Sequence, residues 1–129
     1  MKTTEKGRLY EQAAADRMTA EGYSIVTRNY RSRYGEIDII ASDGKFLVFA
    51  EVRARKIGAP VSAIYSITRA KIHKICKTAM MYLSENKTGL QPRFDVIAVT
   101  ISPAGDILEY NHIKNAFDYE VSYNEYENF

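Results

Sequence analysis

Apolar residues recur along the first half of the chain with the period of two that is typical of β-strands. Residues 23–30 alternate in this way and predict a first strand. Residues 36–41 and 46–53 are rich in Ile, Val and Phe, and the turn sequence Ser42-Asp43-Gly44-Lys45 lies between them. Asp-Gly is a strong signal for a tight hairpin turn, so we predict a β-hairpin over residues 36–53.

Two other segments carry apolar residues at helical spacing. The first is predicted to run from a cap at Thr3 or Thr4 to about Glu21. Its apolar side consists of Leu9, Ala13, Ala14 and Met18. The second lies between residues 64 and 83, and Thr68 is a candidate for its N-terminal cap. We therefore predict one long helix before the first strand and one after the hairpin.

Two further strands follow the second helix. Residues 93–102 are strongly apolar, residues 103–106 predict a turn, and residues 107–113 return as a shorter strand. The order of helix, three strands, helix and two strands predicts a mixed β-sheet flanked by helices, in an α/β or α+β fold. A chain of 129 residues buries enough apolar surface to fold as one domain without a disulfide, and Cys76 is its single cysteine.

Charge is distributed unevenly along the chain. Residues 118–129 hold four of the 16 acidic residues and none of the 18 basic ones, so residues 1–117 carry 18 basic against 12 acidic side chains. A basic body favours a polyanionic partner, although an ordinary solvated surface explains it equally well. We predict a single domain over residues 1–117 and an acidic, tyrosine-rich tail over residues 118–129.

The sequence carries no signal for export or membrane insertion. Residues 1–8 lack an apolar segment, and the purest apolar run, residues 46–50, is far shorter than the roughly 20 residues that cross a bilayer. One cysteine and two histidines also exclude the common zinc sites built from four such ligands. We expect a cytoplasmic protein without membrane contact.

Acidic residues lie inside the apolar strands of the predicted hairpin. A two-residue loop at Asp43-Gly44 places Asp38 opposite Phe49 and Glu36 opposite Glu51. The acids then project from one face, where the Asp38 and Glu51 carboxylates are diagonal neighbours roughly 7 Å apart. Two carboxylates at this spacing predict a site for Mg²⁺, which commonly takes one or two carboxylates together with phosphate and water oxygens.

A plainer interpretation is that this face is exposed to solvent and that its acids pair with arginines. Those arginines are Arg31, Arg33, Arg53 and Arg55. Ile40 and Leu47 lie on the same face, which indicates that at least part of it is covered. The register decides the shared metal site, because a three-residue loop would direct the Asp38 and Glu51 side chains to opposite faces.

A wider pattern resembles the bacterial YraN family and covers nearly the whole chain. Its residues are Glu11, Arg28-Asn29-Tyr30, Gly35-Glu36-Ile37-Asp38, Val48-Phe49-Ala50-Glu51-Val52-Arg53, Lys71-Ile72, Arg93-Phe94-Asp95 and Asn115-Ala116-Phe117. That family is similar to the PD-(D/E)xK nucleases of the restriction-endonuclease-like fold and, among them, to the archaeal Holliday-junction resolvases. The resemblance implies a central mixed β-sheet flanked by α-helices and a site that binds Mg²⁺ or Mn²⁺.

Carried over residue by residue, the resemblance implies that Asp38 and Glu51 bind metal and that Glu11 orients a ligand or a water molecule. Arg53 stands where the nuclease motif usually has lysine. Lysine can help to deprotonate water, whereas arginine stays protonated and can only orient groups or stabilise charge, for example on a pentavalent phosphate. Lys71 is a candidate to take the place of the missing lysine.

Basic and aromatic residues near this face are the predicted nucleic-acid contacts. They are Arg28, Tyr30, Arg31, Arg33, Arg55, Lys56, Lys71 and Lys74. We expect DNA rather than RNA as the partner, and a homodimer would suit a two-fold DNA junction. Three functions stay open: a metal-dependent, structure-selective endonuclease that hydrolyses DNA, a nuclease-fold module that binds nucleic acid without turnover, and a structural or interaction protein.

The remaining polar residues of interest favour structural roles. Asp95 lies at the start of a buried strand beside Arg93, and a local ion pair is the expectation. Cys76 lies among apolar helix residues and is expected in the core. His73 and His112 stand alone without metal-ligand spacing, and the sequence assigns no role to either.

Overall fold

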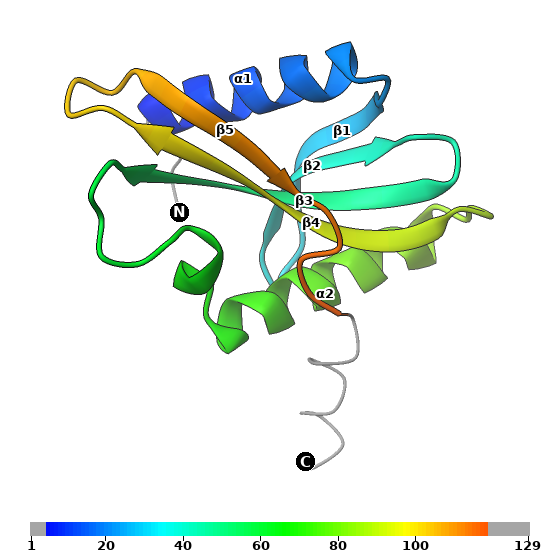
Figure 1. Ribbon diagram of the computed structural model, residues 1–129. Coiled ribbons are helices and arrows are strands. Elements are labelled where there is room, and N and C mark those ends of the chain that lie inside the picture. The colour runs from blue at the N-terminus through cyan, green and yellow to red at the C-terminus, as the bar shows by residue number, and fades with distance from the viewer. Residues whose placement is uncertain (1–4, 119–129) are drawn as a thin grey trace.

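The computed structural model describes residues 5–118, so the predicted caps Thr3 and Thr4 and most of the predicted tail lie outside it. This part of the chain forms two long helices, a short 3₁₀ helix and five strands (Figure 1). In chain order they are α1 (Glu5–Ala20), β1 (Ser24–Arg31), β2 (Glu36–Ser42), β3 (Phe46–Lys56), η1 (Ile64–Ser66), α2 (Arg69–Glu85), β4 (Gln91–Ile101) and β5 (Ile107–Ile113). The helices and strands predicted from periodicity are all present, with boundaries shifted by a few residues.

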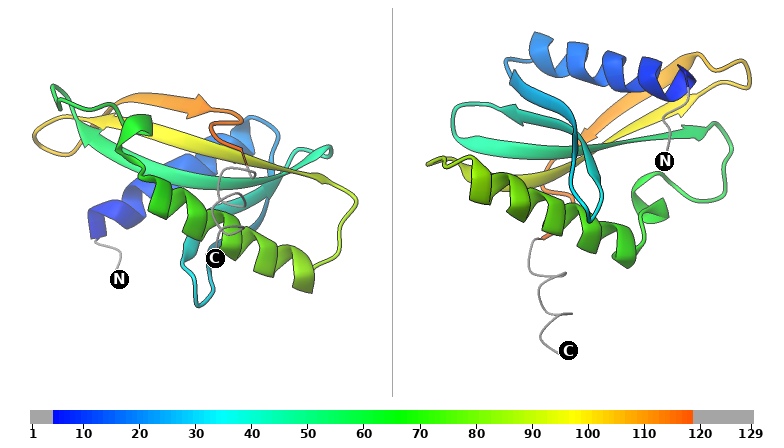
Figure 2. Two further views of the ribbon diagram at one scale, coloured as in Figure 1. Left: turned by 90° about the horizontal axis from the view of Figure 1, so that it is seen from below. Right: turned by 180° about the vertical axis from the view of Figure 1, so that it is seen from behind.

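The strands form one mixed sheet in the order β1-β2-β3-β4-β5. Neighbours run antiparallel except β3 and β4, whose parallel pairing requires the crossover that α2 provides. α1 covers one face of the sheet and α2 covers the other, as the views from below and behind also show (Figure 2). The fold is the predicted α/β architecture with a central mixed sheet, and it is consistent with a restriction-endonuclease-like fold.

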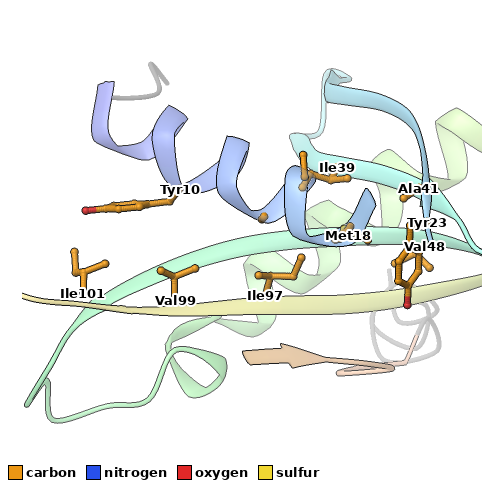
Figure 3. Packing of buried hydrophobic residues seen from close by; sticks show 12 residues of the cluster. Tyr10, Met18, Tyr23, Ile39, Ala41, Val48, Ile97, Val99 and Ile101 are labelled. Atoms are coloured by element: carbon orange, nitrogen blue, oxygen red, sulfur yellow. The ribbon is translucent and has the colours of Figure 1, made fainter. Parts of the chain in front are cut away.

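Each helix buries its own apolar cluster against the sheet. The cluster under α1 includes Tyr10, Ala14, Met18, Ile39, Val48, Ile97 and Val99 (Figure 3). The cluster under α2 includes Ile37, Ile40, Leu47, Phe49, Ile75, Cys76 and Phe94, so Cys76 is a core residue as predicted. The prediction for α1 is wrong at Leu9, which is 62% exposed, because the buried stripe of this helix is centred on Tyr10, Glu11, Ala14, Ala15 and Met18.

The β2–β3 hairpin differs in register from the prediction. Ile40, and not Asp38, lies opposite Phe49, and the connection is longer than two residues. Asp43 stabilises this longer loop, because its Oδ1 atom accepts two backbone hydrogen bonds of 2.8 and 2.7 Å from within it. The pairs that form are each displaced by two residues from the predicted ones.

A displacement of two residues preserves the alternation of side chains, so Asp38 and Glu51 still share one face of the sheet. Glu36 does not lie opposite Glu51 as predicted. It pairs with Arg31 across the β1–β2 hairpin, where its carboxylate lies 3.6 Å from the Arg31 guanidinium. The predicted pairing of Glu36 with Glu51 is therefore absent, and Arg31 is the cation nearest to Glu36, whose charge still raises the pKa of Glu11 and Asp38.

α2 begins where the sequence predicts. The Thr68 hydroxyl accepts a hydrogen bond of 3.1 Å from the Lys71 backbone N–H, which satisfies one of the free donors of the first turn. This cap fixes the start of the helix and with it the position of the Lys71 side chain. Within residues 5–118, no helix is both long enough and apolar enough to span a bilayer.

Candidate metal and nucleic-acid site

The site lies where β2 and β3 separate. Their ladder ends at the pair of Ile39 and Ala50, whereas β3 stays paired with β4 as far as Lys56. At the point of separation, Asp38 Oδ2 accepts a hydrogen bond of 2.8 Å from the Val52 N–H, in place of a backbone carbonyl. This bond fixes the Asp38 carboxylate between the two diverging strands.

Three carboxyl groups from three elements meet at this point. Asp38 of β2 shares hydrogen bonds with Glu51 of β3 and with Glu11 of α1. Glu11 is 8% exposed, Asp38 9% and Glu51 5%. The Oε1 atom of Glu11 is buried and has no hydrogen-bond partner among the described residues. We call Glu11, Asp38 and Glu51 the carboxylate cluster.

Burial is the main cause that raises the pKa of every member of the carboxylate cluster. It raises the pKa of Glu11 to about 7 and that of Glu51 to about 8, and the nearby Asp38 charge adds to both shifts. The pKa of Asp38 is raised by burial as well, although the hydrogen bond from the Val52 N–H opposes this. The carboxyl groups of the cluster therefore hold part of their protons at neutral pH. When they ionise, the neighbouring cations do not fully balance their negative charge.

Two cations lie beside Glu51. The Lys71 Nζ atom is 3.6 Å and the Arg53 Nη1 atom 3.7 Å from Glu51 Oε2. Arg53 is also held by η1, because it donates hydrogen bonds of 3.0 Å to the Ser66 hydroxyl and 3.3 Å to the Ser66 carbonyl. The Lys71 ammonium lowers the pKa of both Asp38 and Glu51, which places a lysine within electrostatic reach of both carboxylates.

A cavity of about 500 Å³, which we call the pocket, opens at the carboxylate cluster. Its lining residues are Glu11, Arg31, Ser32, Arg33, Tyr34, Gly35, Glu36, Asp38, Lys71 and Lys74. Glu11 and Asp38 contribute to this lining, whereas Glu51 and Arg53 do not. One part of the pocket is thus acidic, and the basic residues of the rest come from the end of β1, the β1–β2 turn and α2.

The β1–β2 turn is packed directly on α2. The Ser32 and Thr78 hydroxyl oxygens are 2.9 Å apart, and a Cβ added to Gly35 would lie 3.4 Å from the Lys74 Cβ atom. The turn projects from the sheet beside α2 in both views of Figure 2. The basic residues of the turn and of α2 are thus held together by packing, although their charges repel.

Asp38 and Glu51 fit Mg²⁺ or Mn²⁺ by the chemistry of their oxygen atoms. The raised pKa values and the unpartnered Oε1 atom of Glu11 agree with a site that a cation completes. Across residues 5–118, no group of three or more His, Cys, Asp or Glu side chains is arranged to hold a metal ion. The fit therefore rests on two carboxylates, with water or phosphate oxygens completing the coordination shell, as is common for Mg²⁺.

The structure brings four of the predicted nucleic-acid contacts to the pocket: Arg31, Arg33, Lys71 and Lys74. Arg55 and Lys56 lie elsewhere, at a second cavity of about 420 Å³ near the end of β3. These two residues are separated from the carboxylate cluster by the stretch of β3 that leads away from it.

Arg28 and Tyr30 of β1 are engaged by the protein itself. Arg28 Nη1 donates a hydrogen bond of 2.7 Å to the side chain of Gln12 on α1. The Tyr30 hydroxyl donates a hydrogen bond of 3.0 Å to Glu85, and its ring packs edge-on against Tyr82. Tyr30 thus anchors β1 to the end of α2, at a distance from the basic part of the pocket.

The sequence predicted only one of the contacts of Asp95, the centre of a second buried polar cluster. Asp95, which is fully buried, forms the predicted ion pair with Arg93 at 2.8 Å, but it also accepts hydrogen bonds from His112 Nε2 at 2.7 Å and the Asn115 N–H at 2.9 Å. Burial raises the pKa of Asp95, but the bonds from His112, Arg93 and Asn115 outweigh it and hold that pKa below its ordinary value. We call Arg93, Asp95 and His112 the Asp95 network. Asp95 and His112 lie in two adjacent predicted strands, and this was the signal in the sequence that could have indicated their contact.

Comparison with known proteins identifies the family. The model of the uncharacterised protein family UPF0102 matches residues 10–99 of this chain. The chain belongs to UPF0102. A UPF0102 protein from Sulfurihydrogenibium sp. (strain YO3AOP1) is 40% identical over 121 residues, which cover 93% of this chain and 100% of the relative. UPF0102 is the YraN family, so the resemblance noted in the sequence is confirmed.

Other UPF0102 relatives match at similar levels. The protein from Symbiobacterium thermophilum is 45% identical over 117 residues, or 86% of this chain and 94% of its own length. The protein from Dichelobacter nodosus is 46% identical over 102 residues, or 78% of this chain and 80% of its own length. The range matched by the UPF0102 model includes the whole carboxylate cluster, Arg53 and Lys71, and it ends before the predicted tail.

Proposed function

We propose that this UPF0102 protein is a metal-dependent, structure-selective endonuclease that hydrolyses phosphodiester bonds in DNA. The observation that supports this proposal is the carboxylate cluster, with Lys71 beside it, at a pocket whose other walls are basic. Buried acids short of positive charge suit a divalent cation, and basic walls suit the phosphates of a nucleic acid. The same elements are the ones that the nuclease resemblance of the sequence implies.

Each residue of the site has a role in this proposal. Asp38 and Glu51 would hold Mg²⁺ or Mn²⁺, which supplies a polarised phosphate and a more acidic water molecule when bound. Glu11 would orient a water molecule there through its Oε1 atom, which has no hydrogen-bond partner among the described residues. Lys71 supplies an ammonium group that can take part in proton transfer, which the guanidinium of Arg53 cannot do. Arg53 stabilises negative charge near Glu51.

A second function is favoured by the contacts of Arg53. Its guanidinium replaces the motif lysine and donates hydrogen bonds to Ser66, which holds it in a structural contact. A protein with this arrangement would bind nucleic acid through the same basic walls without turning it over. The alternative is therefore a nuclease-fold binding module.

The decisive experiment is a cleavage assay on purified protein with four-way junction, flap, nicked, duplex and single-stranded DNA, each with Mg²⁺ and with Mn²⁺. We expect cleavage of at least one branched or unpaired substrate, reduced at least about 100-fold by Asp38→Asn and by Glu51→Gln. Asp106→Asn, which removes an acid from the exposed β4–β5 turn, is the matched control and should stay within twofold of wild type.

Three outcomes separate the functions. Cleavage that depends on Asp38 and Glu51 supports the endonuclease. Binding without cleavage on every substrate and with both metals refutes hydrolysis and supports the binding module. A protein with no salt-dependent affinity for any nucleic acid refutes both, because each uses the basic walls of the pocket.

A further inference from the structure

Tyr34 is the centre of a concentration of positive charge at the β1–β2 turn. Arg33 Nη2 donates a hydrogen bond of 2.9 Å to the Tyr34 hydroxyl, and the Arg33 guanidinium carbon lies 5.0 Å from the centre of the Tyr34 ring. From α2, the Lys77 Nζ atom lies 4.4 Å from the same ring centre. Because the hydroxyl oxygen accepts the bond from Arg33, the hydroxyl proton is left to donate to a ligand.

Lys74 adds a second donor to the same side of the pocket. It precedes Lys77 by one turn of α2, so the two side chains project from neighbouring positions on the helix surface. No ion pair or hydrogen bond of the Lys74 ammonium is present within residues 5–118, whereas the Arg31 guanidinium is 3.6 Å from Glu36. We call Arg31, Arg33, Tyr34 and Lys74 the basic wall of the pocket.

The basic wall lines the same cavity as Glu11 and Asp38 of the carboxylate cluster, but the two parts attract opposite charges. The acidic part suits a phosphate that is bound through a divalent cation. The basic part suits a second phosphate, which the basic side chains bind directly. We propose that the basic wall is a binding subsite for the phosphate adjacent to the one at the carboxylate cluster, and that it selects an unpaired DNA strand over a duplex. The inference rests on the proposed function for its ligand, DNA, but not on hydrolysis.

The burial of the carboxylate cluster explains the preference for an unpaired strand. Glu11 and Asp38, the two members that line the pocket of about 500 Å³, are each less than one-tenth exposed, so a DNA backbone must enter the pocket to reach them. A duplex is a stiff rod, with a persistence length of about 50 nm, and its paired bases keep the backbone from bending into such a space. A single strand bends at each nucleotide and can follow a basic channel, with an aromatic ring for contact.

The turn that carries part of the basic wall is held in place by the protein, which favours a specific phosphate site over long-range electrostatic attraction alone. The Ser32–Thr78 contact and the close approach of Gly35 to Lys74 hold the turn against α2 before any ligand arrives. Donors fixed in advance lose little conformational freedom on binding. The subsite therefore contributes affinity in addition to the long-range attraction of a basic surface.

The test measures binding of the full chain to a fluorescent single-stranded oligonucleotide and to the duplex of the same sequence, by anisotropy in Ca²⁺. The test variant is the double substitution Arg33→Ala/Lys74→Ala. Lys45→Ala/Lys87→Ala, which removes the same charge from exposed positions outside the pocket, is the matched control. Tyr34→Phe removes only a hydroxyl and serves as the second variant if the double variant does not fold.

We expect the test variant to bind the single strand at least tenfold more weakly than wild type and the duplex less than threefold more weakly. The salt dependence of single-strand binding should fall by about 0.7 in slope for each lost phosphate contact. The control should stay within threefold on both ligands, and Tyr34→Phe should weaken single-strand binding two- to fivefold.

Equal losses on single strand and duplex, or equal losses in the test and control variants, would overturn the subsite. Unchanged single-strand binding by Tyr34→Phe would remove Tyr34 from it. A wild type that binds as expected but cleaves nothing with Mg²⁺ supports the subsite and refutes hydrolysis, so the two proposals fail separately.

Discussion

Buried acids occur at two places in the fold, at Asp95 and in the carboxylate cluster, and their charges are balanced in opposite ways. Asp95 is surrounded by donors from Arg93, His112 and Asn115, and its pKa is held below the ordinary value. The carboxylate cluster gathers three acids, Lys71 and Arg53 lie 3.6 and 3.7 Å from Glu51, and the pKa values of the acids are nevertheless raised, mainly by burial. A satisfied buried acid stabilises a fold, whereas acids left short of positive charge are typical of a functional site.

The largest expected effect is on the satisfied acid. Asp95→Asn removes the closer and fully buried of the two carboxylates paired with the Arg93 guanidinium, the other being Asp43 at 3.8 Å, so the free energy of unfolding should fall by about 3 kcal/mol or more. Urea denaturation measures this, with Asp106→Asn as the exposed control. A loss below about 1 kcal/mol would contradict a structural role for the Asp95 network.

The pH dependence of stability should have opposite signs in the two groups. A carboxyl group with a raised pKa stabilises the fold below its ordinary pKa of 4.5, and this contribution is lost as pH rises through about 7 for Glu11 and about 8 for Glu51. Asp95, with a lowered pKa, loses its contribution as pH falls below its ordinary value of 3.8. Thermal unfolding in a chelating buffer should show stability falling by several degrees between pH 5 and 8. A rise over that interval would be incompatible with this account.

Removing one unsatisfied acid should cost nothing in the absence of metal. Glu51→Gln at pH 8 should leave the free energy of unfolding unchanged or raise it by about 1 kcal/mol, because the ionised form is penalised by burial. The variant should also flatten the fall in stability between pH 5 and 8. A destabilisation as large as that of Asp95→Asn would show that Glu51 belongs to the same class as Asp95.

Only a small loss of stability is expected at Arg53. Its side chain is partly exposed, and the ion pair with Glu51 is long at 3.7 Å, so Arg53→Ala should cost about 1 kcal/mol or less. The same change should lower Mg²⁺-dependent cleavage about tenfold. The affinity for DNA should stay within threefold, because other basic side chains supply it. If Arg53→Ala lowers the free energy of unfolding as much as Asp95→Asn does, the hydrogen bonds of Arg53 to Ser66 contribute more to stability than its ion pair with Glu51.

Most of the fold could be predicted because it depends on local periodicity. The alternation over residues 23–30 and the helical spacing over residues 64–83 each indicate one element, and both form. The exact hairpin loop could not be predicted, because two backbone hydrogen bonds to the Asp43 side chain decide between loops of similar sequence preference. The shared face of Asp38 and Glu51 survived that error because the displacement was an even number of residues.

The site was predictable only in part because it depends on contacts between distant elements. The hairpin predicts Asp38 and Glu51, but Glu11 came from family resemblance alone, since its position requires α1 to be placed on the sheet. Arg53 and Ser66 are 13 residues apart, and Asp95 and His112 are 17 apart. Such pairs are set by the packing of η1 and β5, which no local pattern encodes.

The central claim is that a divalent cation completes the carboxylate cluster, and titration calorimetry tests it most directly. Mn²⁺ is titrated at pH 7 into metal-free protein in two buffers of different ionisation enthalpy, which reports the protons released on binding. We expect binding with release of about one proton, because the proton that Glu51 retains at pH 7 must leave before its carboxylate can bind metal. Binding should be lost in Glu51→Gln and Asp38→Asn and kept in Asp106→Asn. No heat of binding at millimolar Mn²⁺, or the same binding in Glu51→Gln, would contradict the claim.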